Sequence, residues 1–289
     1  MKMDWTTEKK GSAVTKENLE TADKIKNEID KVNFGKEQEE WNKQYAKAFL
    51  KKRTEKSRIC CGLWGDPKRG KTGVALDFPD RPIFVLDWDR GVESIWREHH
   101  GADERIKVFC PIVKDKDNII DINKSEKNSL MFINMARVFM QENPDEKPVF
   151  VFDGVDTFHN AALLKVNPNP LVVTQLMPWQ YGERNKTFNF MLEAVYSLPC
   201  DVIYITHKKE RYLNNAVVGY DPVWKDWGGK LEQEISFSAQ ESKGEIKYVA
   251  KLLASRTNGN LVGTIWTVRE GKPPNTVWHG IPELREGNI

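Results

Sequence analysis

Residues 65–72 read Gly-Asp-Pro-Lys-Arg-Gly-Lys-Thr, a complete G-x-x-x-x-G-K-[ST] pattern of a phosphate-binding loop. Gly65 and Gly70 let the backbone curl so that its N–H groups point at phosphate oxygens. Lys71 can reach the β- and γ-phosphates, and the Thr72 hydroxyl can ligate Mg²⁺. The residues predicted to contact the nucleotide are Gly65, Asp66, Pro67, Lys68, Arg69, Gly70, Lys71, Thr72 and Gly73.

The sequence on both sides of this loop matches the strand, loop and helix that a phosphate-binding loop requires. Residues 59–64 form a short apolar run that suits a buried strand, and residues 73–77 suit the start of a helix. The alternative is a surface turn rich in glycine and lysine, which would not need this context. The flanking residues therefore favour a nucleotide site.

Size and composition set the limits for the rest of the chain. Its 289 residues can form one substantial α/β core and a smaller appendage, and a charged fraction of 30% predicts a soluble globular protein. The net charge of +2 gives no global reason to expect nucleic-acid binding, so any such contact must come from a local basic patch. The sequence has no stretch of about 18 apolar residues, so it predicts no membrane span. The four cysteines suit buried, reduced thiols, so we expect a cytoplasmic protein without a membrane partner.

The first 56 residues differ from the remainder. They are rich in charged side chains, and residues 37–53 place Trp41, Tyr45 and Phe49 on one helical face. We predict a helical N-terminal arm over residues 1–56, mobile at its start, whose helix docks on the core or on a neighbouring subunit. Residues 57–289 are predicted to form the ATPase domain.

Strands and helices alternate through most of the second region. Short apolar runs predict strands at residues 83–86, 106–113, 148–153 and 201–206. Helical patterns fall at residues 92–99, 130–141 and 187–198, and residues 114–129 are predicted to be a loop. Such alternation is typical of a parallel sheet with helices on both faces. Two further strands, at 246–254 and 261–268, are joined by an Asn-Gly turn within 256–260, which predicts an antiparallel end to the sheet.

Two carboxylates are candidates for work at the phosphates. Asp153 ends a buried apolar strand, where it can complete the Mg²⁺ site with Thr72, although it can also simply cap the segment that follows. Asp89 follows the strand after the phosphate loop and is our candidate for orienting or deprotonating the attacking water. Asp87, two residues earlier, competes for that role, and an ordinary loop carboxylate is the third alternative.

His207 follows the predicted strand 201–206 at its C-terminal end, where nucleotides bind in sheets of this kind. A histidine there can donate a hydrogen bond to the γ-phosphate and transmit hydrolysis to the loop that follows. A lone histidine is more often structural, but the basic run after it favours a sensor.

The order of these segments resembles that of RecA-like phage nucleotide-binding proteins, which are AAA-type P-loop ATPases. The best-known members of that family are single-strand annealing recombinases. The resemblance covers roughly residues 57–270 and rests on Gly65–Thr72, residues 86–89, residues 150–153, residues 180–185 and residues 202–207. It implies a RecA-like P-loop NTPase core that uses ATP and Mg²⁺. Family members usually carry Glu where Asp89 stands, so the shorter side chain bears on hydrolysis more than on binding.

The resemblance also implies DNA-contacting loops, by position at residues 164–186 and 208–230. In the second segment, basic side chains can pair with phosphates and exposed aromatic rings can stack on unpaired bases. These residues are Lys208, Lys209, Arg211, Tyr212, Trp224, Lys225, Trp227 and Lys230. The segment can instead be a partly ordered lid or a subunit contact. RecA-like ATPases commonly form rings or filaments in which a neighbour supplies a basic residue, and Lys251 and Arg256 are candidates by position.

These features give two main hypotheses. The first is an ATP-hydrolysing protein that binds single-stranded DNA as an oligomer and promotes recombination or strand annealing. The second is a P-loop ATPase that acts on protein as a loading factor, assembly factor or switch, which the low net charge and long N-terminal arm favour. A small-molecule kinase is a weaker third reading, because the sequence shows no convincing pair of arginines for a second phosphate substrate.

Overall fold

The computed structural model describes residues 35–36, 39, 58–167, 177–214, 216–224, 227–242, 245–271 and 277–289. The chain divides into two units, Met1–Glu55 and Lys56–Ile289. The predicted arm over residues 1–56 and its helix at 37–53 lie almost entirely outside the described residues, so both stay predictions.

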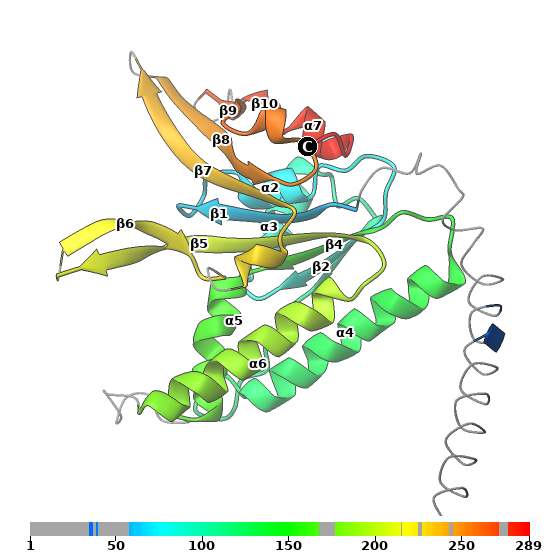
Figure 1. Cartoon of the computed structure of the whole chain (residues 1–289), viewed down its shortest axis with the longest axis vertical. Coiled ribbons are helices and arrows are strands. Elements are labelled where there is room, and N and C mark those ends of the chain that lie inside the picture. The colour runs from blue at the N-terminus through cyan, green and yellow to red at the C-terminus, as the bar shows by residue number, and fades with distance from the viewer. Residues whose placement is uncertain are drawn as a thin grey trace, which may run out of the picture. The chain divides into compact units, whose positions relative to one another are not determined.

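A ten-stranded sheet forms the core of the second unit, in the order β10-β9-β8-β7-β1-β5-β4-β2-β3, with β6 attached to β5 (Figure 1). The strands are β1 (Cys60–Gly65), β2 (Ile83–Asp87), β3 (Ile106–Phe109), β4 (Val149–Asp153), β5 (Asp201–Leu213), β6 (Ala216–Pro222), β7 (Gln233–Ser242), β8 (Glu245–Ser255), β9 (Ile265–Glu270) and β10 (Val277–Trp278). From β7 to β3 the pairs are parallel, and from β7 to β10 they are antiparallel. This sheet confirms the predicted α/β class with antiparallel C-terminal strands.

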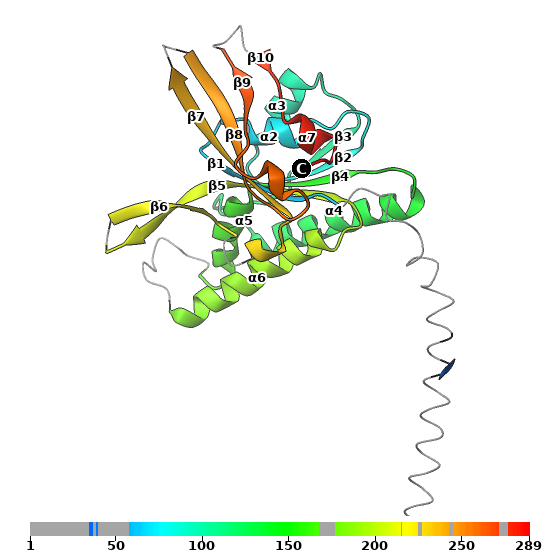
Figure 2. The ribbon, with the colours of Figure 1, turned by 45° about the horizontal axis from the view of Figure 1, so that its top comes forward.

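Helices cover the sheet on both faces, as Figure 2 shows. One face packs against α4 (Ile122–Glu142), α5 (Val155–Ala161) and α6 (Pro178–Tyr196), and the other against α2 (Lys71–Ala75), α3 (Val92–His99) and α7 (Pro282–Arg285). Strands β2 and β4 are buried along their whole length, because both of their faces meet apolar helices. Among the described residues, no helix is both long enough and apolar enough to cross a bilayer.

Helix α4 corrects the prediction that residues 114–129 form a loop. The helix begins at Ile122, after Asp121 caps it by accepting a hydrogen bond from the Lys124 amide. Its buried face includes Ser125 and Ser129, and Ser129 accepts a hydrogen bond from the Trp88 indole. Two of the inward positions of the first turns are therefore polar in sequence, and an apolar period could not reveal them. The predicted start at residue 130 missed two turns for this reason.

Three other boundaries differ from the predictions. Helix α6 begins at Pro178 instead of residue 187, since proline suits a first helical turn and Gln180 accepts a hydrogen bond from the Met177 amide. Strand β3 ends at Phe109, four residues short of the predicted 113. The predicted antiparallel pair near the C-terminus is present as β8 and β9, but β9 begins at Ile265 and a 3₁₀ turn, Gly259–Leu261, occupies the connection.

Strand β5 is twice the predicted length, and this changes the segment after His207. It continues to Leu213 and pairs antiparallel with β6, from Lys208 opposite Pro222 to Leu213 opposite Ala216. Figure 1 shows these two strands projecting beyond the body of the sheet. Most of the predicted DNA loop at residues 208–230 is therefore a β-hairpin, which we call the basic hairpin (residues 208–222).

All four cysteines are free thiols. Cys60, Cys61 and Cys200 are buried as predicted, and burial raises the pKa of Cys60 to about 11 and of Cys200 to about 12. Cys110 is exposed, in contrast to the prediction, because β3 ends at the residue before it.

Buried His159 on α5 makes folding sensitive to acid. Its ring lies edge-on to Phe188 at 4.8 Å, and burial, followed by repulsion from Arg184 and Lys209, lowers its pKa to about 4. Below the ordinary pKa near 6.5, His159 is protonated in the unfolded chain but stays neutral in the folded chain. The free energy of unfolding therefore falls as the pH drops toward 4. Between pH 6.5 and 4.5 we expect wild type to lose about 2 kcal/mol more than His159→Leu in urea denaturation. Equal losses in the two proteins would contradict this reading.

Candidate functional site

The phosphate-binding loop runs from the end of β1 into α2, and glycines set its path. Gly65 has a φ of 144°, and a Cβ there would lie 2.2 Å from the Phe237 carbonyl oxygen of the neighbouring strand β7. Gly70 has a φ of 94° at the entry to α2. Both conformations are ones that only glycine adopts without strain, so the two glycines of the sequence pattern stand where the loop needs them.

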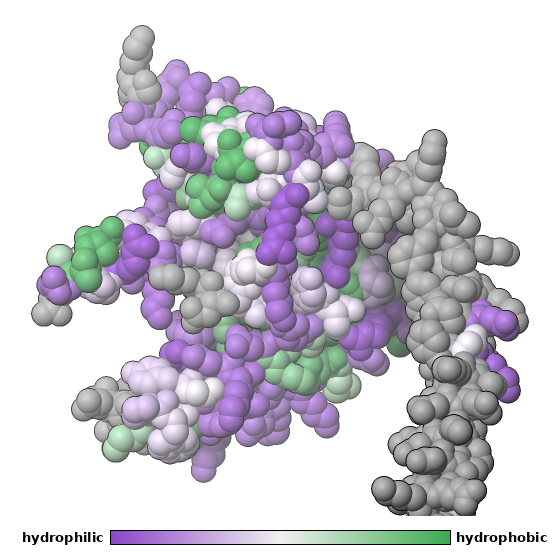
Figure 3. Space-filling view, viewed as in Figure 1, coloured by the Kyte–Doolittle hydropathy of each residue, from purple (hydrophilic) through white to green (hydrophobic). Residues whose placement is uncertain are grey.

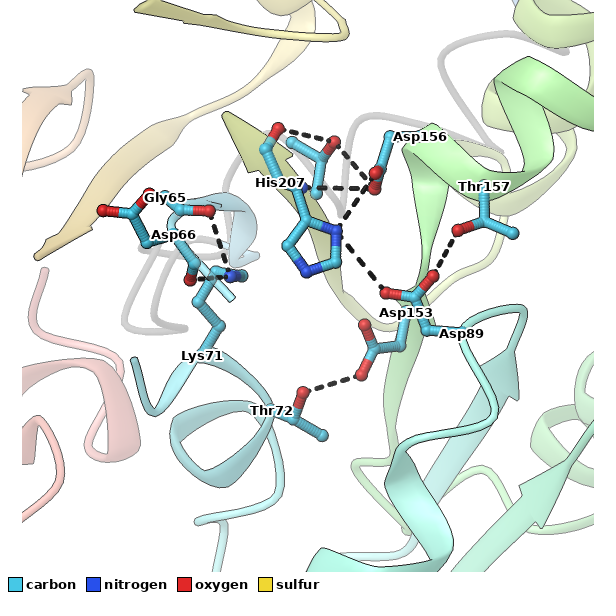
Figure 4. A network of polar contacts seen from close by, with 10 residues as sticks. Gly65, Asp66, Lys71, Thr72, Asp89, Asp153, Asp156, Thr157 and His207 are labelled. Carbon is cyan, nitrogen blue, oxygen red and sulfur yellow. Dashed lines mark hydrogen bonds and ion pairs between the residues drawn. The ribbon is translucent and has the colours of Figure 1, made fainter. Parts of the chain in front are cut away.

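Lys71 lies within this loop (Figure 4), and its side chain is buried, at 5% exposure. Its Nζ donates to the carbonyl oxygens of Gly65 at 3.2 Å and Asp66 at 2.7 Å. Burial lowers the pKa of Lys71, while the nearby carboxylates, Asp153 first, oppose that shift. A desolvated cation that is held by two neutral carbonyls is stabilised strongly by an incoming anion, because the electrostatic attraction is poorly screened. A triphosphate would supply such an anion.

Thr72 and Asp153, the pair predicted to bind the metal, contact each other across the loop. The Thr72 hydroxyl donates to Oδ2 of Asp153 at 2.8 Å, and Asp153 ends the buried strand β4. Burial, and then the charge of Asp89, raises the pKa of Asp153 to about 7. A desolvated carboxylate beside a hydroxyl offers the oxygen donors that Mg²⁺ prefers, and a cation would remove the electrostatic cost of ionising Asp153. These two residues therefore fit a Mg²⁺ ion.

Asp89 and Asp87 lie in different surroundings. Asp89 accepts a hydrogen bond from the Thr157 hydroxyl, and its Oδ2 lies 3.7 Å from Nδ1 of His207 (Figure 4). Asp87 is buried and accepts from the Val92 amide at 3.2 Å, so it holds the first turn of α3. This geometry favours Asp89 over Asp87 as the candidate for orienting or deprotonating the attacking water, and it gives Asp87 a local structural role.

His207 stands at the end of β5, where Nδ1 contacts Oδ2 of Asp156 at 3.0 Å. Asp156 also accepts from the Thr206 hydroxyl and from the His207 amide. The hydrogen bond with Asp156 raises the pKa of His207, which favours the imidazolium form. Because Nδ1 is engaged by Asp156, Nε2 is the ring nitrogen that can donate to a phosphate oxygen.

Three residues of this network were missed from the sequence, and all lie just after Asp153, at the N-cap and in the first turn of α5. Asp156 and Thr157 hold His207 and Asp89, while Gly154, at a φ of 82°, leaves room for Asp89. A Cβ on Gly154 would lie 2.7 Å from the Asp89 amide nitrogen. The pattern Asp-Gly-x-Asp-Thr at residues 153–157, directly after a buried strand, carried a usable signal. Asp89, Asp156 and His207 place ligand atoms within 4.8 Å of one another, a spacing that can also hold a cation.

The basic hairpin meets the phosphate loop at its base. Lys208 pairs with the Asp66 carboxylate at 2.8 Å and lies over the Tyr220 ring at 4.0 Å. Farther out, Lys209, Arg211 and Tyr212 are exposed, and Arg211 pairs with Asp221 at 3.4 Å. The hairpin thus begins beside the phosphate loop, and its other cationic and aromatic side chains lie farther from that loop.

Other candidates after the hairpin do not lie where the sequence placed them. Trp224 and Trp227 are buried, at 1% and 6% exposure, so the expectation that they stack on DNA bases is wrong. The Trp227 ring packs on Tyr204 and its indole donates to Glu193, because both tryptophans belong to the core against α6. Lys230 forms an ion pair with Glu193, which partly neutralises it, and Lys225 lies outside the described residues.

The remaining candidates stay predictions. Lys251 is exposed on β8, and the Arg256 guanidinium donates to the Gly229 carbonyl of its own chain. Within residues 164–186, residues 168–176 lie outside the described residues. The described part includes the exposed side chains of Trp179 and Tyr181 at the start of α6.

Three features together define a nucleotide-binding P-loop ATPase fold. They are the phosphate-binding loop between Gly65 and Gly70, the Thr72–Asp153 pair, and the parallel sheet covered by helices. The family model described as an AAA domain, AAA_24, matches residues 57–236, and the chain belongs to this family. No curated protein sequence matches.

Two solved structures to which this chain is similar have low sequence identity to it. A KaiC-like protein from the hyperthermophilic archaeon Pyrococcus horikoshii is 10% identical, with a TM-score of 0.45 over 76% of this chain and 88% of that one. An ATPase from the type III secretion system of pathogenic bacteria is 15% identical, with a TM-score of 0.40 over 62% of this chain and 51% of that one.

Proposed function

We propose that this protein binds ATP with Mg²⁺ and hydrolyses it at the site formed by the phosphate loop, Asp153, Asp89 and His207. The observation that carries the proposal is the convergence of these side chains, from four separate segments, beside a buried lysine. Thr72 and Asp153 would hold the Mg²⁺, which when bound offsets negative charge on the β- and γ-phosphates.

Each side chain then has a defined task. Lys71 exchanges its two carbonyl partners for phosphate oxygens. Asp89, fixed by the Thr157 hydroxyl, orients or deprotonates the attacking water. His207, oriented by Asp156, donates from Nε2 to the γ-phosphate and loses that contact after hydrolysis.

We further propose that single-stranded DNA is the macromolecule whose binding this cycle controls. His207 and the first arm of the basic hairpin, residues 208–213, belong to one continuous strand, β5, so a change at the γ-phosphate would act directly on the hairpin. The Lys208–Asp66 pair joins the hairpin to the phosphate loop a second time. Lys209 and Arg211 can pair with the DNA backbone, and Tyr212 and Tyr220 are exposed rings on which unpaired bases can stack.

In this proposal the protein acts in the phage or host cytoplasm as a ring or filament that promotes recombination or strand annealing. A row of such subunits would place successive hairpins along one strand of DNA, with Lys251 or Arg256 as candidates for the basic group that each subunit offers to its neighbour.

ATPase rates with and without single-stranded DNA, and DNA affinity measured at several salt concentrations, test this function. We expect DNA to stimulate turnover and the logarithm of the affinity to fall linearly with the logarithm of salt concentration. Lys209→Ala with Arg211→Ala should reduce that slope by about 1.4, at about 0.7 for each contact with single-stranded DNA. The matched double variant Lys107→Ala with Lys127→Ala, both exposed and away from the hairpin, should bind like wild type. Absence of DNA binding in every nucleotide state would reject the DNA role and leave the ATPase role standing.

An ATPase that acts on a protein partner is the second candidate, and one observation favours it. The tip of the basic hairpin exposes Leu213, Val217 and Val218, which Figure 3 shows as a hydrophobic patch on the projecting arm. Aliphatic side chains gain little from a phosphate backbone but pack well in a protein interface. DNA-independent turnover would support this candidate.

A further inference from the structure

Three large side chains form a row across the C-terminal strands, beside the phosphate loop. Tyr248 on β8 lies opposite Arg269 on β9, and Arg269 lies opposite Trp278 on β10. The Arg269 guanidinium stacks over the Tyr248 ring at 4.0 Å and its Nη2 donates to the Lys68 carbonyl at 3.5 Å. Arg69 of the phosphate loop also lies over Tyr248, at 5.5 Å. This row therefore contacts the outer side of the loop.

Trp278 is the member of the row closest to the glycines that end the loop. A Cβ on Gly73 would lie 2.7 Å from Cη2 of Trp278, and a Cβ on Gly70 would lie 3.5 Å from Cζ3. The indole thus rests on the two glycines, and it still has an exposed fraction of 37%. A large aromatic side chain with a supported side and a solvent-facing side is a surface on which another flat ring can stack.

The position of Trp278 is fixed by the segment that follows it. Arg285 of α7 forms an ion pair with Asp77, just beyond α2, and Ile281, Leu284 and Ile289 are buried against the same face of the sheet. The C-terminal segment therefore lies along α2, with Trp278 beside Gly70 and Gly73. An aromatic ring held in place in this way loses little freedom when a ligand stacks on it.

The sheet order gives the direction in which a bound nucleotide must run. Strands β5 and β4, which carry His207 and Asp153, lie on one side of β1, and β7 to β10 lie on the other. In the proposed site the γ-phosphate would face the side chains of the first group. The α-phosphate and the nucleoside attached to it would then extend toward the second group, where Trp278 stands.

We propose that Trp278 is the stacking platform for the base of the bound nucleotide, and that Arg269 and Tyr248 brace the loop beside it. The ligand class is a heteroaromatic nucleobase joined to a triphosphate. This inference rests on the proposed nucleotide binding, and it assigns the nucleoside half of the ligand to β10.

Titration with ATP and with inorganic tripolyphosphate, both with Mg²⁺, separates the base from the phosphates. Trp278→Leu keeps an apolar side chain over Gly73 but removes the aromatic face. We expect it to bind ATP about tenfold more weakly than wild type, the usual scale of a lost base stack, and to bind tripolyphosphate unchanged. Trp278→Phe should retain most of the ATP affinity. Val277→Ala, the neighbouring exposed residue of the same strand, is the matched control and should bind both ligands like wild type.

The outcomes distinguish this inference from the function beneath it. If wild type binds neither ligand, the proposed nucleotide site fails. If wild type binds both and Trp278→Leu keeps full ATP affinity, or loses affinity for both ligands equally, only the base platform fails. Photolabelling of the wild-type chain with 8-azido-ATP gives a test that needs no variant. We expect the adduct on the peptide that contains Trp278, and an adduct found only elsewhere would overturn the assignment.

Discussion

Replacement of Lys71 by alanine is expected to abolish ATP turnover, with a fall in kcat of about 10²–10³-fold or more. Lys71 holds the buried ammonium of the loop, close to the carboxylates of the site. In the proposed mechanism its charge compensates the oxygens of the transferring phosphate, and no other described side chain within the loop is placed to replace it. Steady-state ATPase rates on the purified chain measure the effect.

Nucleotide-dependent stability separates loss of the site from loss of the fold. At an ATP concentration a hundred times the Kd, binding should stabilise wild type by about 2.7 kcal/mol and raise its Tm by about 5–10 °C. Lys71→Ala should show almost none of this rise, while its Tm without ATP stays near that of wild type. Lys107→Ala, which removes an exposed lysine from the edge strand β3, should behave like wild type in both assays. Turnover that survives in Lys71→Ala would overturn the assignment of the phosphate loop.

The parts of the fold that could be predicted are those whose signal is local. The strands around Val85 and Val151 are continuous apolar runs because both of their faces are covered, and the phosphate loop is a fixed pattern of residue types. Helix α4 was shortened in the prediction because Ser125 and Ser129 occupy inward positions, where they accept tertiary hydrogen bonds. The basic hairpin was missed because strand β5 does not stop at His207, and polar residues that pair outside the sheet body give no buried alternation.

The candidate site divides in the same way. Lys71, Thr72 and Asp153 follow from spacing along the chain, and the structure brings them together. Asp156 was missed because its role depends on β5 lying beside β4, a neighbour relation that no short pattern encodes. The prediction that Trp224 and Trp227 stack on bases at the surface was wrong for the opposite reason. A tryptophan beside lysines resembles a nucleic-acid contact in sequence, and only the packing of α6 shows that these two are core.

Asp89→Asn is expected to separate binding from hydrolysis. The substitution keeps the size of the side chain and an oxygen that can accept from Thr157, but it removes the base and the negative charge beside His207. We expect kcat to fall by about 10²–10⁴-fold, the usual contribution of a positioned general base, and the ATP-induced rise in Tm to remain. Single-turnover assays and thermal melts on the same preparation measure the two quantities.

Asp87→Asn is the matched control, since it makes the same chemical change two residues away. Asp87 is buried and holds the Val92 amide, so its loss should lower the free energy of unfolding by about 1–2 kcal/mol and leave hydrolysis largely intact. If Asp87→Asn stops turnover and Asp89→Asn does not, the two roles are exchanged.

The short reach of Asp89 is compatible with catalysis because Gly154 brings the β4–α5 turn against it. A glycine at that position lets the chain approach the carboxylate, and Thr157, three residues on, fixes the direction in which it points.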